Sequence, residues 1–250
     1  MKILLTGATG YIGKRLLPLL LKEGHEVICC VRDKKRFNVE KYSSLNLQVI
    51  EVNFLDSAVE IQFPEGIDAA YYLIHSMSSG DRSFEELEQR SAESFREAAG
   101  RAKIKQVIYL SGIVNEVTLS KHLISRKNVE DILSTGSYAL TTLRAGIIVG
   151  SGSASFEIIR DLVEKLPIMI TPRWLNTRTQ PIAIRNVIEY LCGVLLRSET
   201  YGKSFDIGGP EHPFINKTKN KAVSKVNIFI VFMVVCLNPE RSEGSVLIIQ

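Results

Sequence analysis

The chain has 250 residues, of which 45% are hydrophobic and 23% charged, a composition that fits a globular protein with a sizeable core. Its formal net charge is +4, and residues 212–250 contribute most of the excess, with five Lys or Arg residues against two Glu residues. The remaining residues are close to neutral, which argues against nucleic acid as a partner.

Six apolar segments predict the strands of a parallel sheet. They are rich in Ile, Val, Leu and Tyr and do not alternate strictly with polar residues, as expected of strands with helices on both faces. In chain order they are Lys2–Thr6, Glu26–Val31, Leu47–Val52, Ala69–Ile74, Gln106–Ser111 and Ala139–Arg144.

Helical patterns separate these strands. The segment Tyr11–Glu23 follows the first strand, and Ser83–Glu86 has the spacing of a capping box ahead of apolar residues at helical spacing up to Ala102. Two more helices are expected over Ile158–Leu166 and Val187–Leu196. Strands that alternate with helices predict an α/β fold, a doubly wound parallel (Rossmann) sheet with a small C-terminal substrate-side region.

A glycine loop joins the first strand to the first helix. In Rossmann sheets the first glycine of such a loop permits a tight turn, the second lets the backbone approach a pyrophosphate, and the third lets helix and strand pack closely. The N-terminus of the helix then faces the phosphate charge. The loop therefore predicts a dinucleotide site formed by Gly7, Thr9, Gly10, Tyr11, Ile12 and Gly13.

Several segments resemble the short-chain dehydrogenase/reductase superfamily. The wider spacing between Gly7 and Gly10 is typical of it, and three later segments look like those of its extended and atypical members, which include the NmrA-like proteins: Leu143–Gly146, Gln180–Ile182 and Phe205–Glu211. A closer resemblance, to the bacterial YbjT-like subgroup, lies in Tyr72–Met77, Arg144–Phe156 and Pro172–Trp174.

The resemblance covers residues 1–211 and implies a domain organisation. Residues 1–150 would form the NAD(P)-binding Rossmann domain, and residues 151–211 would add substrate-side segments that complete the same fold. Residues 212–250 form an atypical tail, for which a frameshifted or disordered segment is the preferred account. The alternative is a tail that touches a membrane, since its apolar run Ile228–Leu237 is too short to span one.

The second strand ends in residues that bear on the choice of dinucleotide. An acid at this position holds the ribose diol of NAD, whereas an arginine accommodates the 2′-phosphate of NADP. Here Arg32 and Asp33 are adjacent, and Lys34, Lys35 and Arg36 add positive charge. We therefore expect NADP(H) in preference to NAD(H), with a solvated basic turn as the alternative for the last three residues.

The third and fourth strands also end in candidate cofactor residues. The resemblance places Asn53 and Phe54 beside the adenine. Leu73, Ile74 and His75 end the fourth strand at the carboxyl edge, where doubly wound sheets bind their ligands. His75 would lie near the ribose or the nicotinamide, although an ordinary loop histidine is an equal alternative.

The expected catalytic residues depart from the family pattern. The resemblance implies a serine at Ser111 and a tyrosine and lysine four positions apart, but no tyrosine of this chain has a lysine at that spacing. His122 and Arg126 stand there instead, one helical turn apart. Histidine can act as acid or base and arginine can hold a ribose or an anion. The alternative is a solvated helix face without chemistry.

The function therefore stays open between two classes. One is an NADP(H)-dependent oxidoreductase acting on a carbonyl or quinone-like small molecule; the other is a non-catalytic NADP(H)-sensing regulatory protein. The resemblance also implies substrate-side residues that would suit a planar or anionic substrate, although arginines that tie loops to carbonyl groups are the alternative. These residues are Arg144, Arg173, Trp174 and Arg178.

The four cysteines lack the spacing of a metal site or a redox pair. They indicate a reducing compartment, and the chain starts directly with a strand pattern in place of a signal peptide, so we expect a cytoplasmic protein without a bound metal.

Overall fold

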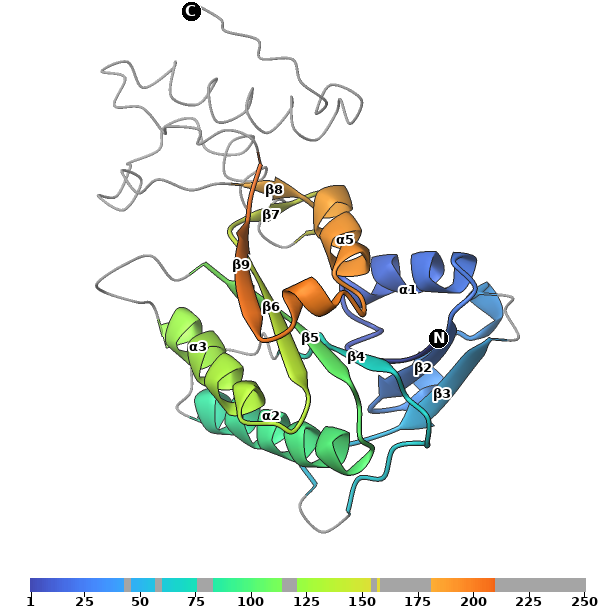
Figure 1. Cartoon of the computed structure of the whole chain (residues 1–250). Helices are drawn as coiled ribbons and strands as arrows, with labels where there is room; N and C mark the ends of the chain where they lie inside the picture. The colour runs from blue at the N-terminus through green and yellow to red at the C-terminus, as the bar shows by residue number, and fades with distance from the viewer. Residues whose placement is uncertain are drawn as a thin grey trace, which may run out of the picture. The chain divides into compact units, whose positions relative to one another are not determined.

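Strand β1 (Lys2–Thr6) is an inner strand of a seven-stranded sheet whose order is β3-β2-β1-β4-β5-β6-β9 (Figure 1). The computed structural model describes residues 1–42, 46–56, 60–75, 83–113, 121–153, 157 and 181–209. The pairs β1–β2, β1–β4, β2–β3 and β4–β5 are all parallel. The order runs outward from β1 in both directions, which confirms the predicted doubly wound Rossmann sheet.

Six strands of the large sheet begin where the apolar pattern predicts and end within two residues of the predicted positions, and a seventh, β9, was not predicted. Besides β1 they are β2 (Glu26–Val31), β3 (Leu47–Glu51), β4 (Ala69–Tyr72), β5 (Gln106–Gly112), β6 (Ala139–Ala145) and β9 (Lys203–Ile207). Two shorter strands, β7 (Ile148–Val149) and β8 (Ile182–Ala183), form a second, parallel sheet.

Helices cover both faces of the large sheet. Helices α2 (Ser83–Arg101) and α3 (Lys121–Ser134) lie side by side on one face, and α1 (Gly13–Lys22) lies on the other (Figure 1). Helix α5 (Ile184–Gly193) starts three residues before the expected position and ends three residues early, at a glycine. The expected helix over Ile158–Leu166 lies outside the described residues.

Short 3₁₀ turns lie in two connections, two between β2 and β3 and one between α5 and β9. They are η1 (Lys34–Arg36), η2 (Glu40–Tyr42) and η4 (Ser198–Thr200).

No helix in the described ranges combines the length and the apolar character needed to cross a bilayer.

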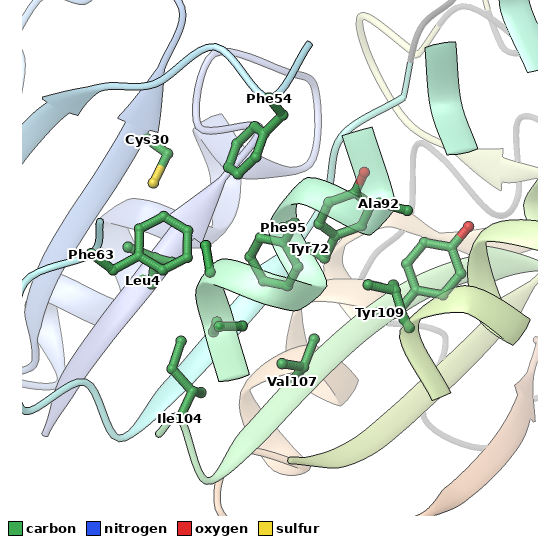
Figure 2. Packing of buried hydrophobic residues seen from close by; sticks show 14 of the residues in the cluster. Leu4, Cys30, Phe54, Phe63, Tyr72, Ala92, Phe95, Ile104, Val107 and Tyr109 are labelled. Carbon is green, nitrogen blue, oxygen red and sulfur yellow. The ribbon is translucent and has the colours of Figure 1, made fainter. Parts of the chain in front are cut away.

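The core under α2 contains a cluster of aromatic rings (Figure 2). Phe95 of α2 contacts Tyr72 at the end of β4, with ring centroids 4.8 Å apart, and Phe54 from the segment after β3, at 5.9 Å. Buried aromatic pairs of this kind contribute about 0.5–1.5 kcal/mol each beyond the burial of their area. The cluster holds the segment after β3 and the helix α2 in fixed positions on either side of the end of β4.

The chain divides into two compact units, Met1–Arg144 with Ile188–Asp206 and Ala145–Val187 with Ile207–Gln250. The geometry described below belongs to the first unit.

Candidate functional site

The glycine loop after β1 is a turn that side chains would disrupt. Gly7 has φ +67°, and a Cβ on it would lie 2.4 Å from the carbonyl oxygen of Leu73. A Cβ on Gly13 would lie 2.3 Å from the carbonyl oxygen of Gly7. At Gly10 a Cβ would make one tight contact, 3.1 Å from that same oxygen, with no other heavy atom of another part of the chain within 4 Å. The loop therefore folds tightly on itself and exposes backbone at Gly10.

Helix α1 starts without a capping side chain on its N-cap residue, Ile12, within the described structure. Its first turn contains no acidic residue. The guanidinium of Arg15 lies over the ring of Tyr11, 3.9 Å from its centroid, and donates a hydrogen bond to the Tyr11 carbonyl oxygen at 3.1 Å. Backbone N–H groups at an uncapped helix start, with positive charge nearby, favour an anion.

A cavity of about 330 Å³ opens at the carboxyl ends of β1 to β4 and extends to α2 and α3. Nine of the predicted cofactor residues line it: Gly7, Thr9, Gly10, Arg32, Asn53, Phe54, Leu73, Ile74 and His75. The other three, Tyr11, Ile12 and Gly13, belong to the loop without lining the cavity. Residues that the sequence did not single out complete the lining: Cys30, Val31, Val52, Leu55, Tyr72, Leu87, Glu88, Ser91 and Val129.

Arg32 also lines a neighbouring hollow of about 480 Å³ together with Thr9, Val31, Asp33 and Arg36. The side chain of Arg32 is exposed, whereas the Asp33 carboxylate is engaged in its own turn. It accepts a hydrogen bond from the backbone N–H of Lys35 at 2.8 Å, and its other oxygen lies 3.8 Å from the Arg36 guanidinium. The hollow is therefore lined by the guanidinium groups of Arg32 and Arg36 and by the Asp33 carboxylate, which already accepts a hydrogen bond from the backbone.

His75 stands at the end of the cavity nearer to β5. Its ring centroid lies 6.4 Å from that of Tyr109 on β5. Burial of the ring, together with the nearby Arg126 guanidinium, lowers the pKa of His75 to about 3, so the imidazole is neutral at pH 7. A hydrogen bond to the backbone of Leu110 engages one ring nitrogen, so the neutral imidazole has one nitrogen left for a neighbouring group.

Two of the three predicted catalytic residues lie at the carboxyl end of β5. Ser111 is 1% exposed, and its hydroxyl has no hydrogen-bond partner among the described residues. The guanidinium of Arg126 lies against the next residue, Gly112, with one nitrogen 3.5 Å from where a Cβ would stand. The backbone of His122 lies in α3 as predicted, and its side chain falls outside the described part of the chain.

Glu88 is the charged residue among the lining residues that the sequence analysis did not single out. It lies in the second turn of α2, is 8% exposed, and accepts a hydrogen bond from the buried hydroxyl of Ser125 on α3. The one available signal was its place beside Leu87 and one turn before Ser91, at the edge of the buried stripe of the helix. An acid at the edge of such a stripe is ordinarily solvated.

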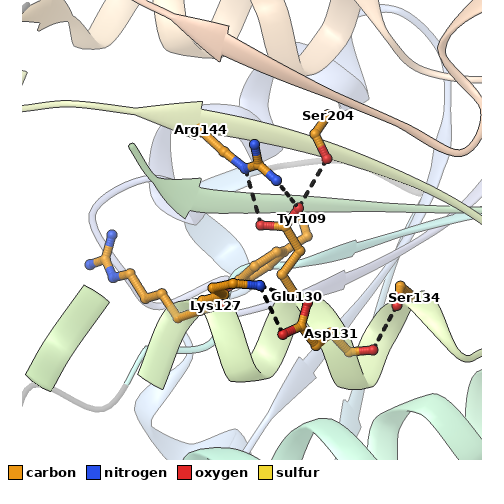
Figure 3. A network of polar contacts seen from close by, with 8 residues as sticks. Tyr109, Lys127, Glu130, Asp131, Ser134, Arg144 and Ser204 are labelled. Carbon is orange, nitrogen blue, oxygen red and sulfur yellow. Dashed lines mark hydrogen bonds and ion pairs between the residues drawn. The ribbon is translucent and has the colours of Figure 1, made fainter. Parts of the chain in front are cut away.

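Arg144 is held by an ion pair (Figure 3). Its Nε and one terminal nitrogen donate to the two carboxylate oxygens of Glu130, at 3.2 and 2.7 Å, and Ser204 donates to the same carboxylate at 2.9 Å. The hydrogen bonds to Glu130 raise the pKa of Arg144. This guanidinium thus has a structural partner, and its substrate role stays a prediction. Arg173, Trp174 and Arg178 lie outside the described residues.

The thiols of the sheet cysteines stay protonated at neutral pH. Cys29 and Cys30 are buried in β2, and burial raises the pKa of Cys29 to about 12. No three His, Cys, Asp or Glu side chains within the described ranges come together as metal ligands would.

Comparison with known families gives one match, to an NAD(P)H-binding domain over residues 7–152. Among curated proteins, the photosystem II assembly factor Ycf39 of Trieres chinensis is 23% identical over 247 residues, which cover 94% of this chain and 75% of the relative.

Solved structures with the same fold include several epimerases. A nucleoside-diphosphate-sugar epimerase from Staphylococcus aureus is 16% identical, with a TM-score of 0.68 over 84% of this chain and 71% of that chain. The Bordetella bronchiseptica enzyme WbmG in complex with NAD is 17% identical, with a TM-score of 0.68 over 92% and 78%. UDP-glucuronic acid 4-epimerase from Bacillus cereus, in complex with UDP-glucuronic acid and NAD, is 20% identical, with a TM-score of 0.66 over 86% and 80%.

Proposed function

Because the chain belongs to the family of NAD(P)H-binding domains, we propose that it is an NADP(H)-dependent oxidoreductase acting on a small carbonyl or quinone-like molecule. The observation that carries the proposal is the single cavity that joins the glycine loop to Arg32 on one side and to His75 on the other. A dinucleotide needs such a continuous site, because its pyrophosphate lies between two nucleosides.

The residues present fit the cofactor. Gly10 lets the pyrophosphate approach the backbone, and the uncapped start of α1 offers N–H groups to its charge. Asn53, Phe54 and Leu55 form the wall that would take the adenine, with Phe54 held by the aromatic cluster. The nicotinamide half would then extend toward His75.

The end of β2 supports a preference for NADP(H). A 2′-phosphate dianion needs cations that are not already paired, and Arg32 is exposed in the hollow beside the loop. The acid that would hold the diol of NAD is Asp33, and its carboxylate already binds the backbone of Lys35. Structures with bound NAD have the same fold, so the fold does not distinguish the two cofactors and the proposal rests on the side chains at this turn.

The chemistry would take place at the end of β5. Bound NADPH supplies a hydride. Ser111 contributes a hydroxyl that can polarise a carbonyl oxygen, and Arg126 can orient a ribose or an anionic group. His122, one helical turn before Arg126, would give up the proton that the reduced oxygen requires. This set replaces the tyrosine and lysine of typical short-chain dehydrogenases, in keeping with an atypical, NmrA-like or YbjT-like member.

A second candidate function is an NADP(H)-sensing protein without catalysis. It is favoured by the absence from the sequence of a tyrosine with a lysine four positions later. In that case the cofactor would bind in the same cavity, and its redox state would be reported to a partner.

Oxidation of NADPH followed at 340 nm with a panel of quinones and aldehydes separates the two candidates. An oxidoreductase turns over at least one acceptor, and Ser111→Ala lowers kcat while leaving the Kd for NADPH unchanged. A protein that binds NADPH but reduces no acceptor of the panel would favour the sensing function.

A further inference from the structure

The cavity wall contains a carboxylate for which the proposed function has no use. Glu88 lines the cavity from α2, between Leu87 and Ser91, and is 8% exposed. Removing a carboxylate from water is costly unless hydrogen bonds replace the lost hydration. An acid in this position therefore calls for donors, from the protein or from a ligand.

The protein supplies one of these donors. Ser125, 1% exposed on α3, donates its hydroxyl proton to Oε2 of Glu88. The two tyrosines of the neighbouring core give their protons elsewhere, Tyr72 to the Ser91 hydroxyl at 3.2 Å and Tyr109 to the Arg126 carbonyl oxygen at 3.3 Å. Within the described residues, Oε1 of Glu88 has no hydrogen-bond donor, although the side chain faces the cavity.

The contact with Ser125 also indicates which half of the cavity Glu88 serves. Ser125 belongs to α3, which packs against α2 and β5, whereas Arg32 ends β2. Strands β1 and β4 lie between β2 and β5, so these two strands are about 14 Å apart at the usual strand spacing. Glu88 thus lies toward the His75 side, away from the residues proposed to hold the 2′-phosphate.

A carboxylate would complement Arg126, the residue expected to hold the ribose on that side. A ribose diol presents two O–H donors, and Arg126, the residue that stands in the place of the family lysine, can only donate. A carboxylate only accepts, and its hydrogen bonds with hydroxyl groups are charge-assisted and therefore strong.

We propose that Glu88 is a specificity-determining residue whose Oε1 accepts a hydrogen bond from the diol of the nicotinamide-side ribose. Ser125 holds the carboxylate in place by occupying its other oxygen. This inference rests on the proposed cofactor site. The Glu88 carboxylate would then bind a ligand through its hydroxyl groups. It would repel an anionic group at the same position.

The test compares three ligands on the full chain by calorimetry. NADPH and 2′-phospho-ADP-ribose both contain the second ribose, whereas 2′,5′-ADP contains only the adenosine half. Glu88→Gln keeps the shape of the side chain and removes its charge. Glu93→Gln, exposed on the same helix, removes the same charge outside the cavity and is the matched control.

The proposal predicts that Glu88→Gln weakens NADPH and 2′-phospho-ADP-ribose by about tenfold or more, the size of one charge-assisted hydrogen bond. Binding of 2′,5′-ADP should match the wild type, which also shows that the variant is folded, and Glu93→Gln should change none of the three affinities.

Equal losses of affinity for all three ligands would assign Glu88 a structural role. A loss of affinity for NADPH alone would place the contact on the nicotinamide ring. Either result overturns the proposal. Unchanged affinities in Glu88→Gln would refute it while leaving the cofactor site intact. A wild-type chain that binds none of the ligands would instead overturn the proposed function.

Discussion

Gly13 packs so closely beneath Gly7 that a Cβ on Gly13 would lie 2.3 Å from the Gly7 carbonyl oxygen. The contact is between backbone atoms, so no side-chain rotation can relieve it. Gly13→Ala should therefore push α1 away from the loop and lower the melting temperature by about 4 °C or more, the shift that about 1–2 kcal/mol produces in a domain of this size.

The control for this variant is Gly193→Ala at the end of α5. A Cβ there meets nothing within 4 Å, so alanine should leave the melting temperature unchanged or raise it slightly. If Gly13→Ala melted like Gly193→Ala, the close packing of α1 on the loop would be disproved.

Arg32 should decide the choice between the two dinucleotides. Arg32→Ala removes the exposed cation of the hollow at the end of β2 and should weaken NADPH by about 1.5–3 kcal/mol, the contribution of a charge-assisted hydrogen bond. NADH lacks the 2′-phosphate, so its affinity should change little. Paired titrations of both cofactors measure the difference.

Lys35→Ala is the matched control, because Lys35 is exposed in the same turn and lines neither cavity. Equal losses of NADPH and NADH affinity in Arg32→Ala would mean that Arg32 has a structural role only.

The elements that could be predicted from the sequence are those set by short-range patterns. Strand β1 was predicted at its observed bounds because a run of apolar residues with no alternation marks a strand buried on both faces. The glycine loop was equally readable, because its glycines and the flanking strand and helix lie within a few residues of each other. Six further predicted cofactor residues line the same cavity as the loop, because they follow parallel strands whose carboxyl ends lie at one edge of the sheet.

The residues that escaped prediction depend on contacts distant in the sequence. Glu88 is buried because α3 brings Ser125, 37 positions later, against it. Arg144 is paired with Glu130, 14 positions earlier on α3, and the sequence does not distinguish a guanidinium that binds a carboxylate from one that binds a substrate. Pairings of this kind are set by how helices pack on the sheet.

His75 should make the stability of the protein depend on pH. In the unfolded chain its imidazole binds a proton below about pH 6.5. In the folded chain its pKa is lowered to about 3, so between these values the unfolded state binds more protons and the folded state loses stability as the pH falls. The loss between pH 6.5 and pH 5 is about 2 kcal/mol.

His75→Gln removes this group while the carboxylates that titrate in the same range stay the same. Urea unfolding of both proteins at pH 6.5 and pH 5 should give a smaller loss in the variant. The same loss in both would show that His75 is as free to take up a proton in the folded protein as in the unfolded chain.

Arg144 should act on stability, because its guanidinium already holds Glu130. Arg144→Met leaves a carboxylate with 10% side-chain exposure without its cation and should cost about 1–3 kcal/mol of unfolding free energy. The double variant Arg144→Met/Glu130→Gln should recover part of that loss, because no unpaired charge remains. A normal unfolding free energy with a raised KM in Arg144→Met would instead support the substrate role.

Titration of the wild type and of Gly10→Val with NADPH tests the cofactor site most directly. A Cβ on Gly10 would lie 3.1 Å from the Gly7 carbonyl oxygen, a tight contact that a shift of a few tenths of an ångström relieves, and the melting transition verifies that the variant is folded. The valine side chain would occupy the space proposed for the pyrophosphate and should weaken NADPH by about 3 kcal/mol, more than a hundredfold. NADPH affinity equal to that of the wild type, in a folded Gly10→Val protein, would contradict the cofactor site.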